Sequence, residues 1–166
     1  EALEKGVATD AVLPSSLDQA QKLWRIREDQ AEVQQRAGAG IKHDISVPVS
    51  RIPEFVARAD AALAAVYPGF RPCTFGHAGD GNLHYNPIRP EDWTDAAWKA
   101  ETNAINRIVH DLVAEMNGSI TAEHGVGRLR MHEMARLKDP VEMALMRRLK
   151  AAMDPAGILN PGKLLA

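Results

Sequence analysis

Two histidines flank a glycine-rich turn and form the densest chemical signal in the sequence. The run from Gly76 to Asn86 reads GHAGDGNLHYN. A two-residue Asp80-Gly81 turn would pair His77 with His84 across an antiparallel hairpin. Directly opposed residues have Cβ atoms about 4.5–5.5 Å apart, which lets two imidazoles bind one metal ion. The spacing therefore predicts a metal-binding pair, and a bulge in the turn would change the register without necessarily separating the rings.

A second segment, Glu123-His124-Gly125-Val126-Gly127, supplies the remaining reactive groups. Two imidazoles and one carboxylate leave coordination positions open for water or substrate, as catalytic metal sites require, and Glu123 is the best candidate for the carboxylate. Adjacent residues of an extended segment point apart, so His124 would stay free as a base. A metal lowers the pKa of a bound hydroxyl and a neutral imidazole takes its proton, so the combination suits alcohol oxidation.

A carboxylate-bearing substrate would require cations beside this site. Arg27 in a predicted helix and Lys42 in a predicted strand are candidates, and Arg25 fits as well as Arg27 on physical grounds. Composition alone would leave these side chains as solvated surface charges. The two-residue period of a strand also places Asn86 on the same face as His84.

Several of these signals also have purely structural interpretations. A Gly-Asp-Gly-Asn turn occurs in inert hairpins, and Asp80 is expected to be a turn residue rather than a ligand. His43 is expected to be structural, whereas His110 and His132 are expected to face solvent from helices. Because no glycine motif follows a strand and opens a helix, phosphate-loop chemistry is not supported.

The elements that must position these residues follow the order β-α-β-β-α-β. Strands are predicted over residues 41–49, 71–78, 83–88 and 119–121, with helices over 53–66 and 94–116. This is the split βαβ arrangement, an α+β fold with an antiparallel sheet and two helices on one face. The remaining predicted elements are a strand over 8–13, a helix over 17–36 capped by Pro14-Ser15-Ser16, and C-terminal helices over 129–137 and 140–153.

Composition limits the classes of function. The 166 residues are 45% hydrophobic and 25% charged, which is ordinary for a globular protein. A net charge of -2 with mixed signs lacks the basic stripe of a nucleic-acid binder. The single Cys73 excludes an internal disulfide, is expected to be a small buried residue and fits a reducing compartment. No apolar run is long enough to span a bilayer, and the start lacks a signal peptide and a Met, so we expect a fragment of a cytoplasmic or mitochondrial-matrix protein.

Five segments, taken together and in order, resemble the C-terminal region of FAD-linked oxidases of the D-lactate, D-2-hydroxyglutarate and glycolate dehydrogenase type, within the vanillyl-alcohol-oxidase-like superfamily. The resemblance covers nearly the whole chain. Its carriers are Leu23-Trp24-x-x-Arg27-Glu28, Lys42-x-Asp44-x-Ser46-x-Pro48, Gly76-His77-x-Gly79-Asp80-Gly81-Asn82-Leu83-His84, Ala122-Glu123-His124-Gly125-Val126-Gly127, and Asp154-Pro155-x-Gly157-Ile158-Leu159-Asn160-Pro161-Gly162-Lys163.

The resemblance implies a role for each candidate residue. The metal ligands, for zinc or manganese, would be His77, His84 and Glu123. The base that removes the substrate hydroxyl proton, as hydride goes to the flavin N5, would be His124. The substrate contacts would be Arg27, Lys42 and Asn86, and the residue approaching the flavin ring would be Asn160. One departure concerns Ala31, because dicarboxylate-oxidising relatives can carry a threonine four residues after the substrate arginine.

The resemblance also implies a domain organisation. Residues 1–121 would form part of a substrate (cap) domain, and residues 122–166 would form a helical segment that packs toward an FAD-binding domain, which lies N-terminal to this region and is absent here. The whole would oxidise a D-2-hydroxy acid to a 2-oxo acid and pass electrons to an acceptor that the sequence does not name. The expected partners are a small 2-hydroxy acid and the FAD-binding domain of the same protein, and a homodimer is a further expectation.

Two alternatives from other classes stay open. One is a non-catalytic metal- or ligand-binding module that has lost its flavin domain. The other is a non-haem iron enzyme, because two histidines and one carboxylate also describe that metal site.

Overall fold

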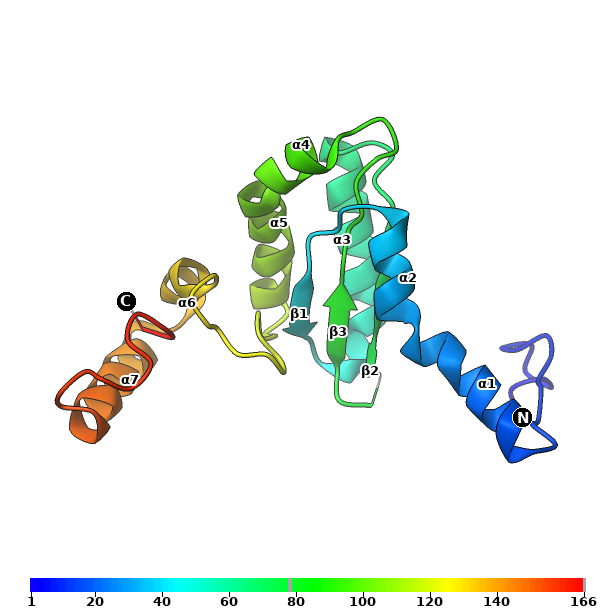
Figure 1. The fold of residues 1–166 in the computed structure, drawn as a ribbon, viewed down its shortest axis with the longest axis horizontal. Coiled ribbons are helices and arrows are strands. Elements are labelled where there is room, and N and C mark those ends of the chain that lie inside the picture. The colour runs from blue at the N-terminus through cyan, green and yellow to red at the C-terminus, as the bar shows by residue number, and fades with distance from the viewer. Residues whose placement is uncertain (78, 166) are drawn as a thin grey trace. The chain divides into compact units, whose positions relative to one another are not determined.

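The computed structural model describes residues 1–77 and 79–165 (Figure 1). The chain divides into two compact units, Glu1–Ala37 and Gly38–Ala166. The predicted α+β class is confirmed, because the second unit combines helices with a three-stranded antiparallel sheet. Among the described residues, no helix is both long enough and apolar enough to cross a membrane.

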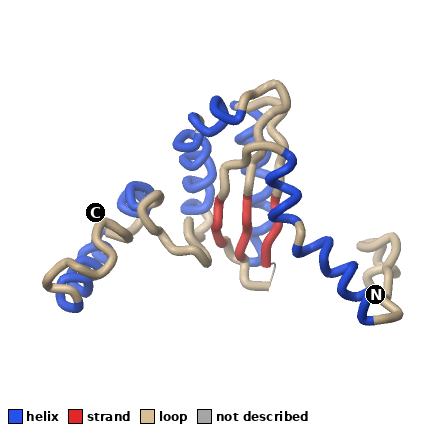
Figure 2. Tube along the Cα trace, in the orientation of Figure 1, coloured by secondary structure: helices blue, strands red, loops and turns tan. Residues whose placement is uncertain are grey.

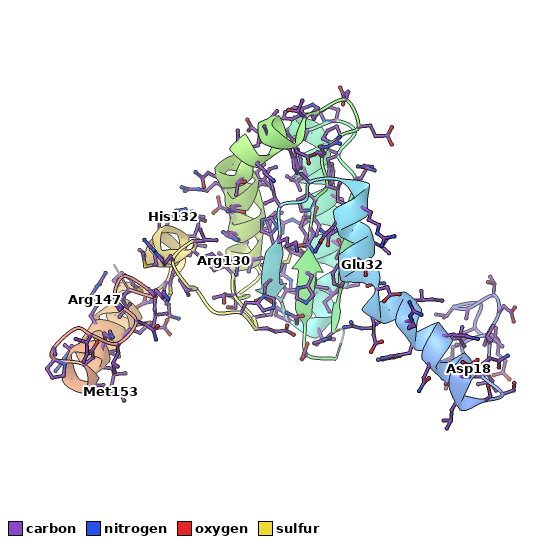
Figure 3. The ribbon with its side chains drawn as sticks, viewed as in Figure 1. Asp18, Glu32, Arg130, His132, Arg147 and Met153 are labelled. Atoms are coloured by element: carbon purple, nitrogen blue, oxygen red, sulfur yellow. The ribbon has the colours of Figure 1, made fainter. Side chains whose placement is uncertain are left out.

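The first unit contains helices α1 (Leu17–Glu28) and α2 (Gln30–Ala37), on which Figure 3 labels Asp18 and Glu32. Ser16 caps α1 by accepting a hydrogen bond from the N–H of Gln19, in agreement with the predicted cap. The single helix predicted over 17–36 is interrupted at residue 29. The strand predicted over 8–13 is wrong, because the described residues of this unit provide no second strand to pair with it.

A small sheet, red in Figure 2, forms the centre of the second unit. Strands β1 (His43–Ser46), β2 (Thr74–His77) and β3 (Asn82–Tyr85) lie in the order β1-β3-β2, and every pair is antiparallel. The strands are shorter than predicted. Pro72 and Pro87 lack the backbone N–H that a ladder needs, so pairing beyond them continues only as single bridges.

Helices α3 (Ile52–Val66) and α5 (Thr102–Glu115) cover one face of the sheet. Ile45 and Tyr85 pack into the core that these helices complete, with Phe55 among their neighbours, and all three side chains are fully buried. Because strand side chains alternate between faces, the even-numbered residues of β1 and β3 point to the opposite face. That second face carries the candidate site.

The prediction for the segment before and within α5 needs one correction. The helix predicted over 94–116 is two helices, α4 (Asp95–Ala100) and α5, with a break at Glu101. The Glu101 carboxylate accepts a hydrogen bond of 2.8 Å from the hydroxyl of Tyr67. Helix α3 agrees with its predicted range and is preceded by a short 3-10 turn, η1 (Val49–Arg51).

The fourth predicted strand is reduced to a single bridge between Ser46 and Ser119. Their backbone N–H groups donate to each other's carbonyl oxygens, each at 2.9 Å. The Ser119 hydroxyl then bonds to the backbone of Thr121, and such local bonds compete with a ladder. The bridge still places the following residues along the edge of β1.

Helices α6 (Met131–Leu137) and α7 (Pro140–Met153) end the fold, and Figure 3 labels His132 and Arg147 on them. Helix α7 matches its predicted range, whereas α6 starts two residues later than the predicted 129–137. A small apolar cluster of Val126, Met134 and Met143 joins the two helices to the preceding loop.

The histidines outside the candidate site divide into two kinds. His43 is buried, as predicted, and its Nδ1–H donates to the Tyr85 carbonyl at 2.7 Å. His132 is exposed, also as predicted. The prediction that His110 faces solvent is wrong, because this side chain is fully buried on α5 with Nδ1 3.1 Å from the Glu133 carboxylate. Glu133 belongs to α6 and is distant from His110 in the sequence. Its carboxylate offsets the cost of burying the ring.

Candidate active site

The hairpin between β2 and β3 has a wider loop than predicted. His77 pairs with Asn82 and Phe75 pairs with His84, so the predicted pairing of His77 with His84 is wrong. The Asp80 side chain accepts a hydrogen bond of 3.0 Å from the N–H of Asn82, which fixes the loop and confirms Asp80 as a turn residue. Residue 78, in this loop, lies outside the described residues.

The two histidines nevertheless share one face of the sheet. His77 lies opposite Asn82, and His84 follows Asn82 by two positions on the same strand. A change of pairing by two positions preserves the face of every side chain, whereas a change of one would reverse it. His77 and His84 are therefore diagonal neighbours on the face turned away from α3 and α5, where such pairs lie about 7–8 Å apart.

Glu123 lies beside both imidazoles. Its Oε1 is 3.2 Å from His77 Nδ1, and its Oε2 is 3.9 Å from His84 Nε2. The Ser46–Ser119 bridge and a backbone bond from the Ala122 N–H to the Asp44 carbonyl bring this segment along β1. The fold thus brings together the three predicted metal ligands.

The donor types of this cluster fit a divalent metal, but their spacing is loose. Donors about 2.1 Å from a tetrahedral ion lie about 3.4 Å from one another, which the His77–Glu123 separation satisfies and the His84–Glu123 separation exceeds. Accordingly, within residues 1–77 and 79–165 no three His, Cys, Asp or Glu side chains are close enough to hold a metal ion. Metal binding stays a prediction.

His124 stacks on His84 at the edge of this cluster. The two ring centroids are 5.8 Å apart and the ring planes differ by 21°. His124 Nε2 lies 3.8 Å from a Glu123 carboxylate oxygen, and its Nδ1 lies 3.2 Å from Asp44 Oδ2. The His124 side chain is 64% exposed, so a substrate can reach the ring that was predicted to be the base.

Asp44 is a site residue for which sequence reasoning gave no role. It occupies the middle of β1 and is only 2% exposed. Its Oδ2 accepts the backbone N–H of Glu123 at 2.9 Å and of His124 at 2.8 Å, while Oδ1 accepts from Asn82 Nδ2 at 3.0 Å. Burial raises the pKa of Asp44, but the backbone N–H groups of His124 and Glu123, helped by the His124 ring and the Asn82 amide, together outweigh burial and bring the pKa below its usual value. The available signal was an acid inside a buried strand, which needs donors.

The three predicted substrate contacts belong to different parts of the chain. Lys42 and His124 both line a cavity of about 560 Å³, whose other charged residues are Lys99, Arg128 and Arg130. Asn86 is buried, and its Oδ1 accepts the backbone N–H of His43 at 3.0 Å, which holds β1 to the chain after β3. Arg27 is exposed on α1 and belongs to the first unit.

Asn160, the predicted flavin contact, lies in the C-terminal tail. Asp154 anchors this tail by accepting the N–H groups of Ile158 and Leu159, each at 3.0 Å. Asn160 then adopts a positive φ of 45° and its side chain is exposed. The residue is therefore presented on the surface of the tail.

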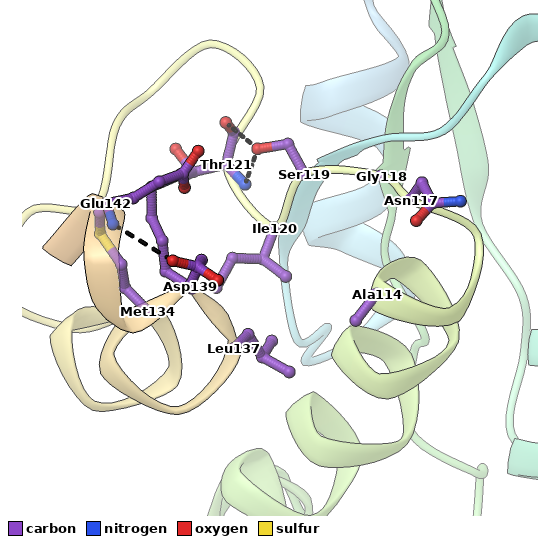
Figure 4. A pocket seen from close by; sticks show the side chains of 11 residues that line it. Ala114, Asn117, Gly118, Ser119, Ile120, Thr121, Met134, Leu137, Asp139 and Glu142 are labelled. Atoms are coloured by element: carbon purple, nitrogen blue, oxygen red, sulfur yellow. Dashed lines mark hydrogen bonds and ion pairs between the residues drawn. The ribbon is translucent and has the colours of Figure 1, made fainter.

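A second cavity, of about 420 Å³, lies away from the histidines, between the end of α5 and the helices α6 and α7 (Figure 4). The Ser119–Thr121 and Asp139–Glu142 hydrogen bonds are drawn at its rim. None of the predicted site residues lines this cavity. The predicted metal ligands and the predicted base lie instead on or beside the sheet face and the cavity that Lys42 lines.

The chain matches one protein family along nearly its whole length. Residues 1–164 match the family described as FAD linked oxidases, C-terminal domain. The chain is 38% identical over 164 residues to a D-2-hydroxyglutarate dehydrogenase of Stutzerimonas stutzeri, an alignment that covers 99% of this chain and 35% of the relative. It is also 38% identical to a mitochondrial D-2-hydroxyglutarate dehydrogenase of Arabidopsis thaliana and 36% identical to that of Bos taurus. These alignments cover 99% of this chain and 28% and 29% of the relatives. The chain thus spans about a third of the length of these curated relatives.

Proposed function

Because the chain belongs to the family of FAD-linked oxidase C-terminal domains, we propose that it is the metal- and substrate-binding portion of a flavin-dependent dehydrogenase. The reaction is the oxidation of a D-2-hydroxy acid to a 2-oxo acid. The observation that carries the proposal is the gathering of His77, His84 and His124 around the carboxylate of Glu123. This arrangement supports a site that binds a hydroxyl group and removes its proton.

His124 is the proposed base. Its exposed ring borders the cavity that Lys42 also lines, so a substrate carboxylate held by Lys42 would bring the neighbouring hydroxyl toward this imidazole. A divalent metal, zinc or manganese, would be held by His77, His84 and Glu123 and would supply a positive charge that lowers the pKa of the substrate hydroxyl. FAD, when bound, supplies the acceptor for the hydride that leaves the substrate carbon.

The substrate class follows from the relatives and the cations. Several relatives are named D-2-hydroxyglutarate dehydrogenase, so D-2-hydroxyglutarate is the first substrate to test, with D-lactate and glycolate beside it. Arg27 and Lys42 are the proposed carboxylate contacts, and Asn86 is proposed as a third contact that also holds the backbone at His43, the residue after Lys42. A residue other than threonine at position 31 makes the comparison of one-carboxylate and two-carboxylate substrates informative.

The proposal assigns the flavin mainly to another part of the protein. Residues 1–121 are proposed as part of the substrate domain and residues 122–166 as the segment that faces an FAD-binding domain, with Asn160 toward the flavin. The isolated chain should then bind metal weakly or moderately and bind little FAD. Substrate-dependent dye reduction by the isolated chain plus FAD would refute this division.

The decisive experiment measures dye reduction by the full-length protein with the three hydroxy acids. His124→Ala should lower kcat/KM by at least about 100-fold, the usual contribution of a general base. His84→Ala removes a direct metal ligand and should cost more than the roughly 10–100-fold lost when a hydrogen-bond partner of a ligand is removed. His132→Ala is the matched control, since His132 is exposed on α6 and does not belong to the site. Full turnover by the His124→Ala protein would remove the base assignment.

Metal content, measured on the same preparations, tests the ligand assignment separately. His77→Ala and Glu123→Ala should lower bound zinc or manganese, while His132→Ala should not. Purified iron together with oxygen-dependent turnover would contradict the proposed dehydrogenase and favour an oxygenase.

A further inference from the structure

We propose that Asp44 is a positioning residue that holds the neutral ring of His124 with its proton on Nδ1, so that Nε2 is left as the acceptor for a substrate proton. The inference rests on the proposed role of His124 as the base. Its own basis is the carboxylate in β1, whose Oδ2 lies 3.2 Å from His124 Nδ1. Asp44 is not proposed to contact the substrate.

The first step of the argument is that the Asp44 carboxylate has a fixed place. One oxygen, Oδ2, accepts the consecutive backbone N–H groups of Glu123 and His124, and the other accepts from Asn82. Three donors on a 2% exposed side chain leave it little freedom to rotate. The carboxylate therefore sets both the path of the backbone at Glu123 and His124 and the position of a negative charge beside the ring.

The second step concerns which ring nitrogen carries the proton. A neutral imidazole has one N–H and one bare nitrogen, and a carboxylate next to one nitrogen favours the proton there. Two carboxylates compete for His124, since Asp44 Oδ2 lies 3.2 Å from Nδ1 and Glu123 Oε2 lies 3.8 Å from Nε2. Asp44 is the closer and the more buried, so it favours the proton on Nδ1, and Nε2 becomes the basic nitrogen.

The third step is that one substitution can separate orientation from folding. Asp44→Asn keeps the shape and retains one oxygen for the backbone N–H groups of residues 123 and 124. Its new amide N–H would face Asn82, whose buried Oδ1 has no hydrogen-bond partner among the described residues. Rotation of the Asn82 amide would let that oxygen accept the new donor. Only the negative charge beside His124 would then be lost.

The tautomer of His124 is read from long-range ¹H–¹⁵N spectra of the ¹⁵N-labelled chain at about pH 8.5, where free imidazole is neutral. The signal is assigned by its loss in His124→Ala. The wild-type ring should carry its proton on Nδ1. Asp44→Asn leaves only a neutral amide oxygen beside Nδ1, against the Glu123 carboxylate 3.8 Å from Nε2, so it should raise the share of the Nε2–H form. The matched control is Asp60→Asn, because Asp60 also accepts a side-chain hydrogen bond, from the Tyr85 hydroxyl at 2.8 Å, but lies outside the site.

Kinetics of the full-length protein complete the test. Asp44→Asn should lower kcat by about 10-fold or more, part of the roughly 100-fold contribution of a general base, with a much smaller change in KM, whereas Asp60→Asn should not. If His124→Ala is inactive but Asp44→Asn leaves the tautomer or kcat unchanged, the positioning role is wrong and the base assignment stands. If His124→Ala keeps full turnover, the base assignment in the proposed function is wrong, and the positioning role that rests on it is wrong as well. A loss of kcat without a change of tautomer would also overturn the inference, since the effect would then come from the backbone alone.

Discussion

Replacing Glu133 by Gln tests the interpretation of a buried charge network that includes Arg136 and His110. Glu133 is 3% exposed, and its carboxylate accepts two hydrogen bonds from Arg136, at 2.7 and 3.2 Å, and one from His110 at 3.1 Å. Burial by itself raises the pKa of Glu133, but Arg136 and then His110 outweigh burial and lower the pKa from 4.5 to about 2. The network joins α6 to α5, so its loss should be visible in the stability of the second unit.

The magnitude follows from linkage between protonation and folding. A pKa of about 2 against 4.5 in the unfolded chain differs by about 2.5 pKa units, which corresponds to about 3 kcal/mol of stability. Because the folded pKa is the lower one, this contribution is complete above about pH 4.5 and disappears as the pH falls toward 2. The advantage of the wild-type protein over Glu133→Gln should therefore shrink by about 2 kcal/mol between pH 6 and pH 3.

Urea unfolding at the two pH values, followed by tryptophan fluorescence, to which the fully buried Trp98 contributes, measures this difference. The matched control is Glu142→Gln, since Glu142 forms an exposed ion pair with Lys138, and its effect should stay within about 0.5 kcal/mol at both pH values. An advantage of the wild type over Glu133→Gln that does not change with pH would refute the reasoning, because the carboxylate would then contribute shape rather than charge.

Three further substitutions test the turn, the core and the helix cap. Gly81→Ala should lower the free energy of unfolding by at least about 2 kcal/mol, because Gly81 has φ +82° and an added Cβ would lie 2.1 Å from a backbone oxygen. Gly79→Ala in the same loop meets nothing within 4 Å and should be nearly neutral in the same urea titration. Tyr85→Phe removes the hydroxyl that donates to Asp60 and should cost about 1–2 kcal/mol by calorimetry; no loss would mean that this bond has no net value. Ser16→Ala should weaken the start of α1 by about 1 kcal/mol, seen as faster amide exchange in its first turn, and unchanged exchange would contradict the cap.

Local sequence signals predicted the elements that depend on local physics. The N-cap at Ser16 and the bounds of α7 agree with the structure because capping and helical periodicity act over a few residues. The fourth strand failed as an extended element because a seryl hydroxyl at position 119 bonds to its own neighbourhood. The break at Glu101 was not predicted, and the Glu101 side chain bonds to Tyr67, a contact between residues 34 positions apart that no local pattern indicates.

The sequence was sufficient to predict which histidines lie together in the site, but not the hairpin register or the long-range contacts that hold them. Period-two alternation was sufficient to place His77 and His84 on one face, and it tolerated a wrong choice of turn because the error was two positions. The role of Asp44 and the burial of His110 depend on partners from residues 123, 124 and 133, which are contacts that only the complete fold creates. Long-range polar partners leave no periodic trace in a sequence.

The hydrogen bonds from Glu123 and His124 to Asp44 also affect the order in which this chain can fold. The bonded residues are separated by 79 and 80 positions in the sequence. Closing so long a loop of chain carries a larger entropic cost than forming the local contacts between β2 and β3. Until residues 123 and 124 arrive, the carboxylate in β1 has only Asn82 as a side-chain donor and favours staying hydrated. The Asp44 side chain and the candidate base beside it should therefore reach their final places only after the segment that follows α5 has joined the edge of β1.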